Sequence, residues 1–386
     1  MKNFSKKNVL NIAWVGQGDF GDEVMAYTLR LFLKKYANLN SITYYQHGKY
    51  PFFRGNNDLK IFSLYSFKTK GIIKFFLDKV FLRRFDVLFI GGGSLLHSVN
   101  SISWKLNIVS HLKKIKHSAF FSACVGVSVG PLDSEPKEKI CQKLLGEMDM
   151  AIFRDNYSFE IAKKMSLKNK LFTSLDTSLL LPELCKNEFA MAKKSARDEN
   201  LVGVLFVKKK NEEDFFKNNL YFEKYLDIIN NVLDREKKVL LVNLYVGDAY
   251  SDIELNKKLK EKSKFPERVE IYTFNGNIFE TIKKLNHCGY IISMRLHGII
   301  LAYILNIPFI SLAYNRKNQD FCDAINYSSN MSFNFYENAE IKPIFHSLNL
   351  LFEQKGGIFN EVLSPEKAGE IVKDNFNLLL KELNKL

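Results

Sequence analysis

An arginine and a histidine stand two residues apart at the start of an apolar segment, SMRLHGIILAYILNIPFISLAYN, residues 293–315. Arg295 and His297 follow a short apolar strand candidate, where a helix is expected to begin. A helix N-terminus with a guanidinium group beside it is suited to bind a phosphate or a carboxylate. Histidine is the side chain whose ordinary pKa lies closest to neutrality, so it can exchange protons there. The segment therefore predicts an anion site with an acid or base beside it.

A second arginine, Arg154, occupies a similar place in the first half of the sequence, directly after the strand candidate 151–153. A surface ion pair with Asp155 is the alternative explanation. If the two halves face each other across a cleft, we expect Arg154 and Arg295 to close on one small polyanion. Lys317, just after the strand that ends near Tyr314, adds a further cation at this edge.

Residues 16–21 (GQGDFG) follow the first strand and match the pattern GxGxxG. A dinucleotide site needs an acidic residue about 20 positions later, and the second strand instead ends in Gln-His-Gly at residues 46–48. Asp19, Asp22 and Glu23 would also repel a pyrophosphate. Carboxylates suit binding of sugar hydroxyls or removal of a proton from one. The alternative is a tight turn whose acidic residues complement a helix dipole.

A glycine triplet, Gly91–Gly93, follows the third strand candidate and is expected to end it. Glycines let a ligand approach the backbone, whose N–H groups can bind an anion.

Strands and helices alternate along both halves, which predicts an α/β protein with two Rossmann-like, doubly wound domains facing each other across a cleft. We place the N-terminal domain, expected to bind the acceptor, at residues 1–185 and the C-terminal domain, expected to bind the donor, at 186–386, with the connection at 179–200. The helix expected at 365–383 would cross back to the first domain. The expected strands are 9–15, 41–46, 85–90, 119–125, 151–153, 201–207, 238–244, 269–272, 290–293 and 309–312, and the main helices 22–36, 220–233, 252–262 and 277–285.

The chain has 386 residues, a formal net charge of +14 and a pI near 9.3. Such a charge suits anionic substrates or membranes, although a general preference for lysine explains about half of the excess. We expect no nucleic-acid partner. The cysteines stand singly, which argues against zinc and against a disulfide framework. The chain ends resemble neither a signal peptide nor a tag, so we expect a cytoplasmic protein.

Two segments raise the question of a membrane. Residues 293–315 are not expected to span one, because they contain polar side chains and Pro308, which should end a helix near Asn306. Residues 67–85 (FKTKGIIKFFLDKVFLRRF) mix large apolar and basic side chains. They suit either a helix on an anionic membrane face, which would place the protein peripherally on the inner face of the membrane, or a core-facing helix with a basic outer side. We favour the core-facing helix.

Taken together, these motifs resemble the polysaccharide pyruvyl transferase family, over roughly residues 9 to 325. The ordered matches are residues 19–23 (DFGDE), Gly91–Gly93, 130–132 (GPL), 153–155 (FRD), Asp176, 295–298 (RLHG), Pro308, Tyr314 and Lys317. Two positions depart from the family pattern, because an asparagine is replaced by Asp19 and an aspartate by Asn315. These departures leave the identity of the acceptor open.

The resemblance implies a fold like that of the GT-B glycosyltransferases. It implies transfer of a pyruvyl group from phosphoenolpyruvate to two hydroxyls of a sugar, lipid-linked or nucleotide-linked, giving a pyruvate ketal without metal or cofactor. The implied catalytic residues are His297 as the general acid, Arg295, Arg154 and Asp176. The implied donor-binding residues are Arg154, Arg295, Leu296, His297, Lys317, Gly91, Gly92 and Gly93. The implied acceptor-binding residues are Asp19, Asp22, Glu23 and Tyr314, and the choice of base among Asp19, Asp22 and Asp176 stays open.

Two other functions fit the same pattern. A nucleotide-sugar glycosyltransferase would bind a nucleoside diphosphate in the second domain. A non-catalytic glycan-binding protein could keep the fold and turn over nothing.

Overall fold

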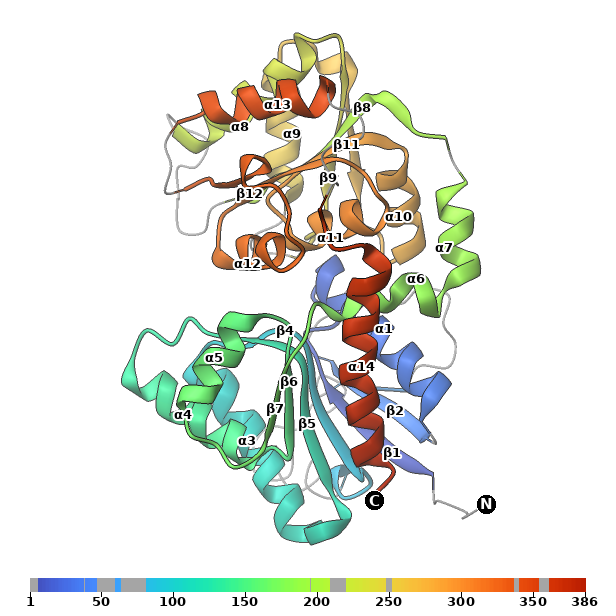
Figure 1. Ribbon diagram of the computed structural model, residues 1–386, viewed down its shortest axis with the longest axis vertical. Helices are drawn as coiled ribbons and strands as arrows, with labels where there is room; N and C mark the ends of the chain where they lie inside the picture. The colour runs from blue at the N-terminus through green and yellow to red at the C-terminus, as the bar shows by residue number, and fades with distance from the viewer. Residues whose placement is uncertain are drawn as a thin grey trace.

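Two parallel β-sheets form the framework of the protein, one in each half of the chain. The computed structural model describes residues 6–37, 39–46, 60–63, 81–194, 196–208, 220–247, 252–336, 340–353 and 361–386. Figure 1 shows the first half below and the second half above, with helices packed around each sheet.

The first sheet has seven strands in the order β3-β2-β1-β4-β5-β6-β7, all paired in parallel. Its inner strands are apolar on both faces: Val9 packs into one hydrophobic core and Leu10, the next residue, into the other. The strands are β1 (Lys7–Ile12), β2 (Leu39–Gln46), β3 (Lys60–Ser63), β4 (Val87–Leu96), β5 (Phe121–Val129), β6 (Met150–Phe153) and β7 (Lys170–Thr173).

The second sheet has six parallel strands in the order β10-β9-β8-β11-β12-β13. Both sheets therefore change winding direction beside their first strand, which is the arrangement of a doubly wound fold. The strands are β8 (Asp198–Leu205), β9 (Lys238–Asn243), β10 (Val269–Thr273), β11 (Cys288–Ser293), β12 (Phe309–Ala313) and β13 (Ser332–Asn334).

The α-helices that cover these sheets begin at polar caps in several places, such as Asp19 before α1 and Ser364 before α14. The helices of the first half and the connection are α1 (Phe20–Tyr36), α3 (Val99–Lys116), α4 (Glu135–Glu147), α5 (Asn156–Lys164), α6 (Leu181–Leu184) and α7 (Lys186–Lys193). Those of the second half are α8 (Leu220–Leu233), α9 (Asp252–Lys262), α10 (Ile278–Asn286), α11 (Leu296–Ile304), α12 (Arg316–Ala324), α13 (Lys342–Glu353) and α14 (Pro365–Leu383).

The expectation that Gly91–Gly93 ends a strand is wrong. Strand β4 continues through the triplet to Leu96, with a register shift against β5 between Gly93 and Leu96. Gly92 and Gly93 have φ values of +75° and +93°. Glycine adopts this left-handed region without steric cost, so the chain forms an irregularity and then resumes pairing.

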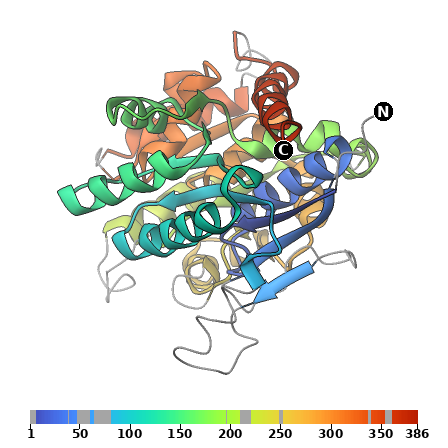
Figure 2. The same cartoon turned by 90° about the horizontal axis from the view of Figure 1, so that it is seen from below.

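The last helix, α14, packs along the first half, as Figures 1 and 2 show. The ring of Phe376 meets that of Phe32 in α1 edge-on at 5.1 Å, and Lys7 Nζ donates to the Leu386 carbonyl at 3.0 Å.

The predicted connection at 179–200 contains α6 and α7 instead of an extended linker, and α7 packs against α10. A single hydrophobic core includes side chains of α1, of α14 and of the second sheet, so the two halves share a continuous apolar contact.

Among the described residues, no helix combines the length and the apolar character needed to span a bilayer. Of the segment 67–85, for which a membrane-surface helix was considered, all but the last five residues lie outside the described part of the chain.

Candidate functional site

Arg154 lies at the end of β6, with 8% of its surface exposed, and its guanidinium is held from two directions. Its Nη1 donates to Asp176 Oδ2 at 3.0 Å, and its Nε donates to Ser128 Oγ at 2.7 Å. The alternative of an ion pair with Asp155 is not what the structure shows, because that carboxylate caps α5 through Ser158 N–H at 2.7 Å. Arg154 is therefore fixed in place by Asp176, which the sequence analysis also singled out.

His297, in the first turn of α11, faces Asp176 from the second half. Its Nε2 lies 3.5 Å from Asp176 Oδ2, which is an ion-pair contact without hydrogen-bond alignment, and this buried nitrogen has no hydrogen-bond partner among the described residues. Burial would raise the pKa of Asp176, but the contact with His297, the charge of Arg154 and the hydrogen bond from Ser178 hold it well below its usual value. Asp176 thus stays ionised and joins the two halves.

Gly21, in the first turn of α1, packs flat against the His297 ring. A Cβ atom on Gly21 would overlap with the imidazole Nδ1. The absence of a side chain at this position is what allows α1 of the first half to approach α11 of the second.

Lys317, in the first turn of α12, is a partly buried cation of this site that has no direct partner for its charge among the described residues. It forms no ion pair or hydrogen bond through its ammonium group with any described residue, in contrast to Arg154 beside it. Burial, followed by the charge of Arg154, lowers the pKa of Lys317 to about 8, although Asp22, Asp19 and Asp155 oppose the change. A buried ammonium group without a direct partner, next to a second cation, is suited to bind an anionic ligand.

A small cavity lies between these groups, with a volume of about 20 Å³. This is room for about one water molecule, so the two halves are closed around the site. The lining residues are Arg154, Asp155, Leu175, Asp176, Leu296, Lys317, Asp320, Phe321 and Ala324.

The three acidic residues at the start of α1 have different surroundings. Asp19 caps the helix by accepting from Gly21 N–H at 2.8 Å. Glu23 is 1% exposed and accepts from Gly16 N–H at 2.7 Å, so it stabilises the loop from inside, and its role in acceptor binding stays a prediction. Asp22 lies near Arg154 and Lys317, whose charges act on it.

The glycine triplet packs against α1. A side chain on Gly92 would press on Met25, and one on Gly93 would overlap with Asp22 Oδ1. Gly91 lies over Asn11 and Leu29. The triplet therefore makes space for α1, and only Gly93 adjoins a site residue.

Arg295 occupies a different environment from Arg154. Its Nη2 and Nε donate to Asp252 at 2.5 and 3.2 Å, and its guanidinium lies 5.5 Å from the centre of the Tyr245 ring. Asp252 is fully buried at the start of α9 and also accepts from Tyr245 N–H. Tyr314 lies close enough for its pKa to respond to Arg295, although burial raises it overall. In this structure the guanidinium groups of Arg154 and Arg295 bind separate aspartates, so their closure on one anion stays a prediction.

The loop of Asp19 is also joined to the second half by backbone hydrogen bonds. Phe20 N–H donates to the Leu244 carbonyl at 3.0 Å, and Val246 N–H to the Gly18 carbonyl at 2.9 Å. The two segments form a short antiparallel bridge between Asp19 and Tyr245. This bridge lies next to the Arg295–Asp252 pair, since Asp252 binds Tyr245 N–H.

A family model described as polysaccharide pyruvyl transferase matches residues 19–316, well over half of the chain. The chain belongs to the polysaccharide pyruvyl transferase family.

Solved structures of similar fold are UDP-N-acetylglucosamine 2-epimerases. The enzyme from Neisseria meningitidis, bound to UDP-GlcNAc, has a TM-score of 0.62 at 11% identity, covering 97% of this chain and 100% of that one. The enzyme from Methanocaldococcus jannaschii has a TM-score of 0.60 at 13% identity with the same coverages, and that from Rickettsia bellii 0.61 at 11%, covering 99% and 98%. These likenesses confirm the predicted GT-B-like pair of Rossmann-like domains.

In this pyruvyl transferase family member, the structure adds residues that the sequence analysis missed. Ser128 and Ser94 both contact the Arg154 guanidinium, the latter at 3.4 Å from Nη2. The sequence analysis predicted Asp252 only as the first residue of a helix and gave it no role in the site. A serine after a strand or an aspartate before a helix is common, so no local signal marks these contacts.

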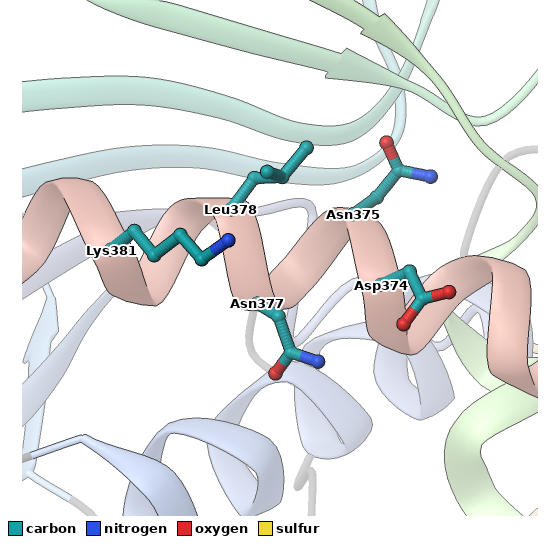
Figure 3. A pocket seen from close by; sticks show the side chains of 5 residues that line it. All are labelled: Asp374, Asn375, Asn377, Leu378 and Lys381. Atoms are coloured by element: carbon teal, nitrogen blue, oxygen red, sulfur yellow. The ribbon is translucent and has the colours of Figure 1, made fainter.

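A second cavity lies on one face of α14, away from the groups described above (Figure 3). Its lining side chains all belong to that helix, and it brings no cluster of charged groups together. Within the described part of the chain, no group of three or more histidine, cysteine or acidic side chains is arranged to hold a metal ion.

Proposed function

We propose that this protein transfers a pyruvyl group from phosphoenolpyruvate to two hydroxyls of one sugar, giving a pyruvate ketal. The observation that supports this most is the cation pair of Arg154 and Lys317 beside His297. Phosphoenolpyruvate has a carboxylate and a phosphate in one small molecule, and needs cations on both. Arginine binds such planar or tetrahedral anions through paired N–H donors, and lysine as a point charge.

The reaction also needs a proton donor at the methylene carbon of phosphoenolpyruvate. His297 is the candidate, because its Nε2 has no hydrogen-bond partner among the described residues and Asp176 holds the ring from one side. Protonation at that carbon lets a sugar hydroxyl attack the neighbouring carbon. Departure of phosphate and attack by the second hydroxyl then close the ketal ring. The cations stabilise the developing charge, so the proposed reaction uses no metal and no cofactor.

The proposed acceptor is a sugar of a glycan or of a lipid-linked or nucleotide-linked glycan precursor, in keeping with the family. We place the reaction in the cytoplasm, where phosphoenolpyruvate is made. Contact with the inner face of the membrane would serve a lipid-linked acceptor.

The test is a phosphate-release assay with phosphoenolpyruvate and a panel of lipid-linked and nucleotide-linked sugars. Wild-type protein should release phosphate only with an acceptor, and His297→Ala should lower the rate by about 10²–10⁴-fold. His346→Ala, which changes an exposed histidine on α13, is the matched control. Full activity in His297→Ala would contradict the mechanism. Calorimetric titration that detects nucleotide sugars but no phosphoenolpyruvate would instead support a glycosyltransferase.

A further inference from the structure

Asp22 differs from the other carboxyl groups around the site, because it has no hydrogen-bond or ion-pair partner among the described residues. The other groups each accept at least one hydrogen bond. These groups and their donors are Asp19 with Gly21 N–H, Glu23 with Gly16 N–H, Asp155 with Ser158 N–H, Asp176 with Arg154 and Ser178, and Asp252 with Arg295. A carboxyl group without donors is free to exchange a proton with a ligand.

The backbone around Asp22 leaves room for its carboxyl group and directs it to the site. Any side chain on Gly93 would overlap with Asp22 Oδ1, and the φ of +93° at Gly93 belongs to the irregularity in β4. Asp22 follows Gly21, the residue that packs against the His297 ring. One turn of helix therefore contains both the residue that packs against His297 and a carboxyl group close enough to Arg154 and Lys317 to respond to their charges.

The surroundings of Asp22 make it a stronger base than an ordinary aspartate. Burial, followed by the charge of Asp19, raises its pKa well above the usual value. Arg154 and Lys317 lower this pKa by less, and Asp176 raises it slightly further. A base is most effective when its pKa approaches the working pH. Asp176, by contrast, is held ionised with a lowered pKa and is a weak base.

We propose that Asp22 is the general base that removes the proton of the attacking sugar hydroxyl. This inference rests on the proposed function. In the first step the hydroxyl O–H bond breaks, its proton passes to Asp22, and its oxygen bonds to the central carbon of phosphoenolpyruvate. His297 gives its proton to the methylene carbon, which becomes a methyl group. In the second step the bond to phosphate breaks, the other hydroxyl oxygen bonds to the same carbon, and its proton leaves with phosphate. Asp22 releases its proton and His297 regains one from solvent, so the cycle balances.

The main experiment compares wild-type protein with Asp22→Asn, which keeps the size of the side chain and removes its basicity. Phosphate release with the acceptor found in the panel should fall by about 10²–10⁴-fold. The dissociation constant for phosphoenolpyruvate, measured by calorimetry, should stay the same or decrease, because a negative charge beside an anion is lost. The residual rate should also lose its dependence on pH on the acid side. Asp374→Asn, an exposed change on α14, should match wild type.

A second variant tests the role of Asp22 through the pH dependence of the rate and not through its size. Asp19→Asn keeps an oxygen that can accept from Gly21 N–H and removes the charge that raises the pKa of Asp22. Because Asp22 must be ionised to act, activity is lost as the pH falls through its pKa. The acid limb of the rate profile should therefore move to lower pH in Asp19→Asn.

The outcomes separate this inference from the function on which it rests. Wild-type protein that neither binds phosphoenolpyruvate nor releases phosphate with any acceptor would overturn both. An active wild type with a folded Asp22→Asn variant that keeps a tenth or more of the rate would overturn only the role of Asp22. An acid limb that does not move in Asp19→Asn would do the same.

Discussion

Arg154 and Arg295 have similar local settings in the two halves, yet they contact different groups. Each follows an inner strand, each precedes a helix, and each forms a buried ion pair with an aspartate. The aspartate of Arg154 is shared with His297 across the halves, and an uncompensated Lys317 lies alongside. Asp252, the aspartate of Arg295, binds no other side chain among the described residues and also accepts from the backbone N–H of Tyr245.

This difference shows that a buried arginine at a strand end is not by itself a ligand site. What distinguishes Arg154 is the neighbouring Lys317, whose ammonium group forms no ion pair or hydrogen bond with a described residue and can bind an anion. Around Arg295 the charges already balance, and the pair supports the bridge through which the Asp19 loop meets the second half. Arg295 and Asp252 both belong to the second half, so their pair acts on the junction only through this bridge, and the role of Arg295 in donor binding stays a prediction.

Substituting each arginine in turn is the most direct test of this difference and has the largest expected effect. Arg295→Met leaves the Asp252 charge buried and unpaired, and should lower the free energy of unfolding by about 3–5 kcal/mol in a denaturant titration. Adding Asp252→Asn should restore most of it, since the buried charge is gone while an acceptor for Tyr245 N–H remains. Arg154→Met also breaks a buried pair and should lower stability, but in addition it should weaken phosphoenolpyruvate binding by about 10²-fold or more, and adding Asp176→Asn should not restore binding.

One result would contradict separate roles for the two arginines. If Arg295→Met stays as stable as wild type but loses phosphoenolpyruvate binding, the two arginines share one ligand, as the sequence alone suggested. Calorimetry and denaturation on the same four variants distinguish the cases.

Much of the fold followed from hydrophobic periodicity. Helices α8, α9 and α14 have the predicted bounds, because each combines an apolar stripe with clear end signals such as Pro365. Strands β3, β7 and β13 were missed, since their short sequences (KIFS, KLFT and SFN) mix polar and apolar residues, unlike the fully apolar β6. The continuation of β4 through its glycines could not be foreseen, because a triplet normally signals a turn.

The site was foreseen in part. Arg154, Asp176, His297 and Lys317 do come together, because parallel strands of both sheets present their carboxyl ends to the same space. The partner of Arg295 was not foreseen, because Asp252 is 43 residues away and only the tertiary fold brings it close. Glu23 was indistinguishable from Asp22 by sequence, since helix phase decides which of two neighbouring carboxyl groups turns inward.

Lys317 sharpens the comparison through pH. Its pKa of about 8 means that it is charged below that pH and neutral above it. Phosphoenolpyruvate affinity should therefore weaken as the pH rises past 8, by up to about tenfold per pH unit. Lys317→Arg, whose guanidinium stays charged, should remove this decline in calorimetric titrations between pH 7 and about 9.5. Lys381→Arg on α14 is the control. A decline that persists unchanged in Lys317→Arg would show that another group controls binding.

The smallest effect concerns a second contact between the halves, at the mouth of the cavity. The Arg316 guanidinium lies 4.0 Å from the centre of the Tyr157 ring, which is 39% exposed, and joins α12 to α5. A cation–π contact at such an exposed position is worth about 0.5–1 kcal/mol, much less than the buried Arg295–Asp252 pair. Because the cavity of about 20 Å³ has to open to admit phosphoenolpyruvate, this weak contact is the one expected to break. Tyr157→Leu should raise the association rate in stopped-flow mixing by about 2–5-fold, the factor equivalent to that energy, and leave unfolding unchanged. An association rate equal to that of wild type would mean that entry does not depend on this contact, and that the halves open elsewhere.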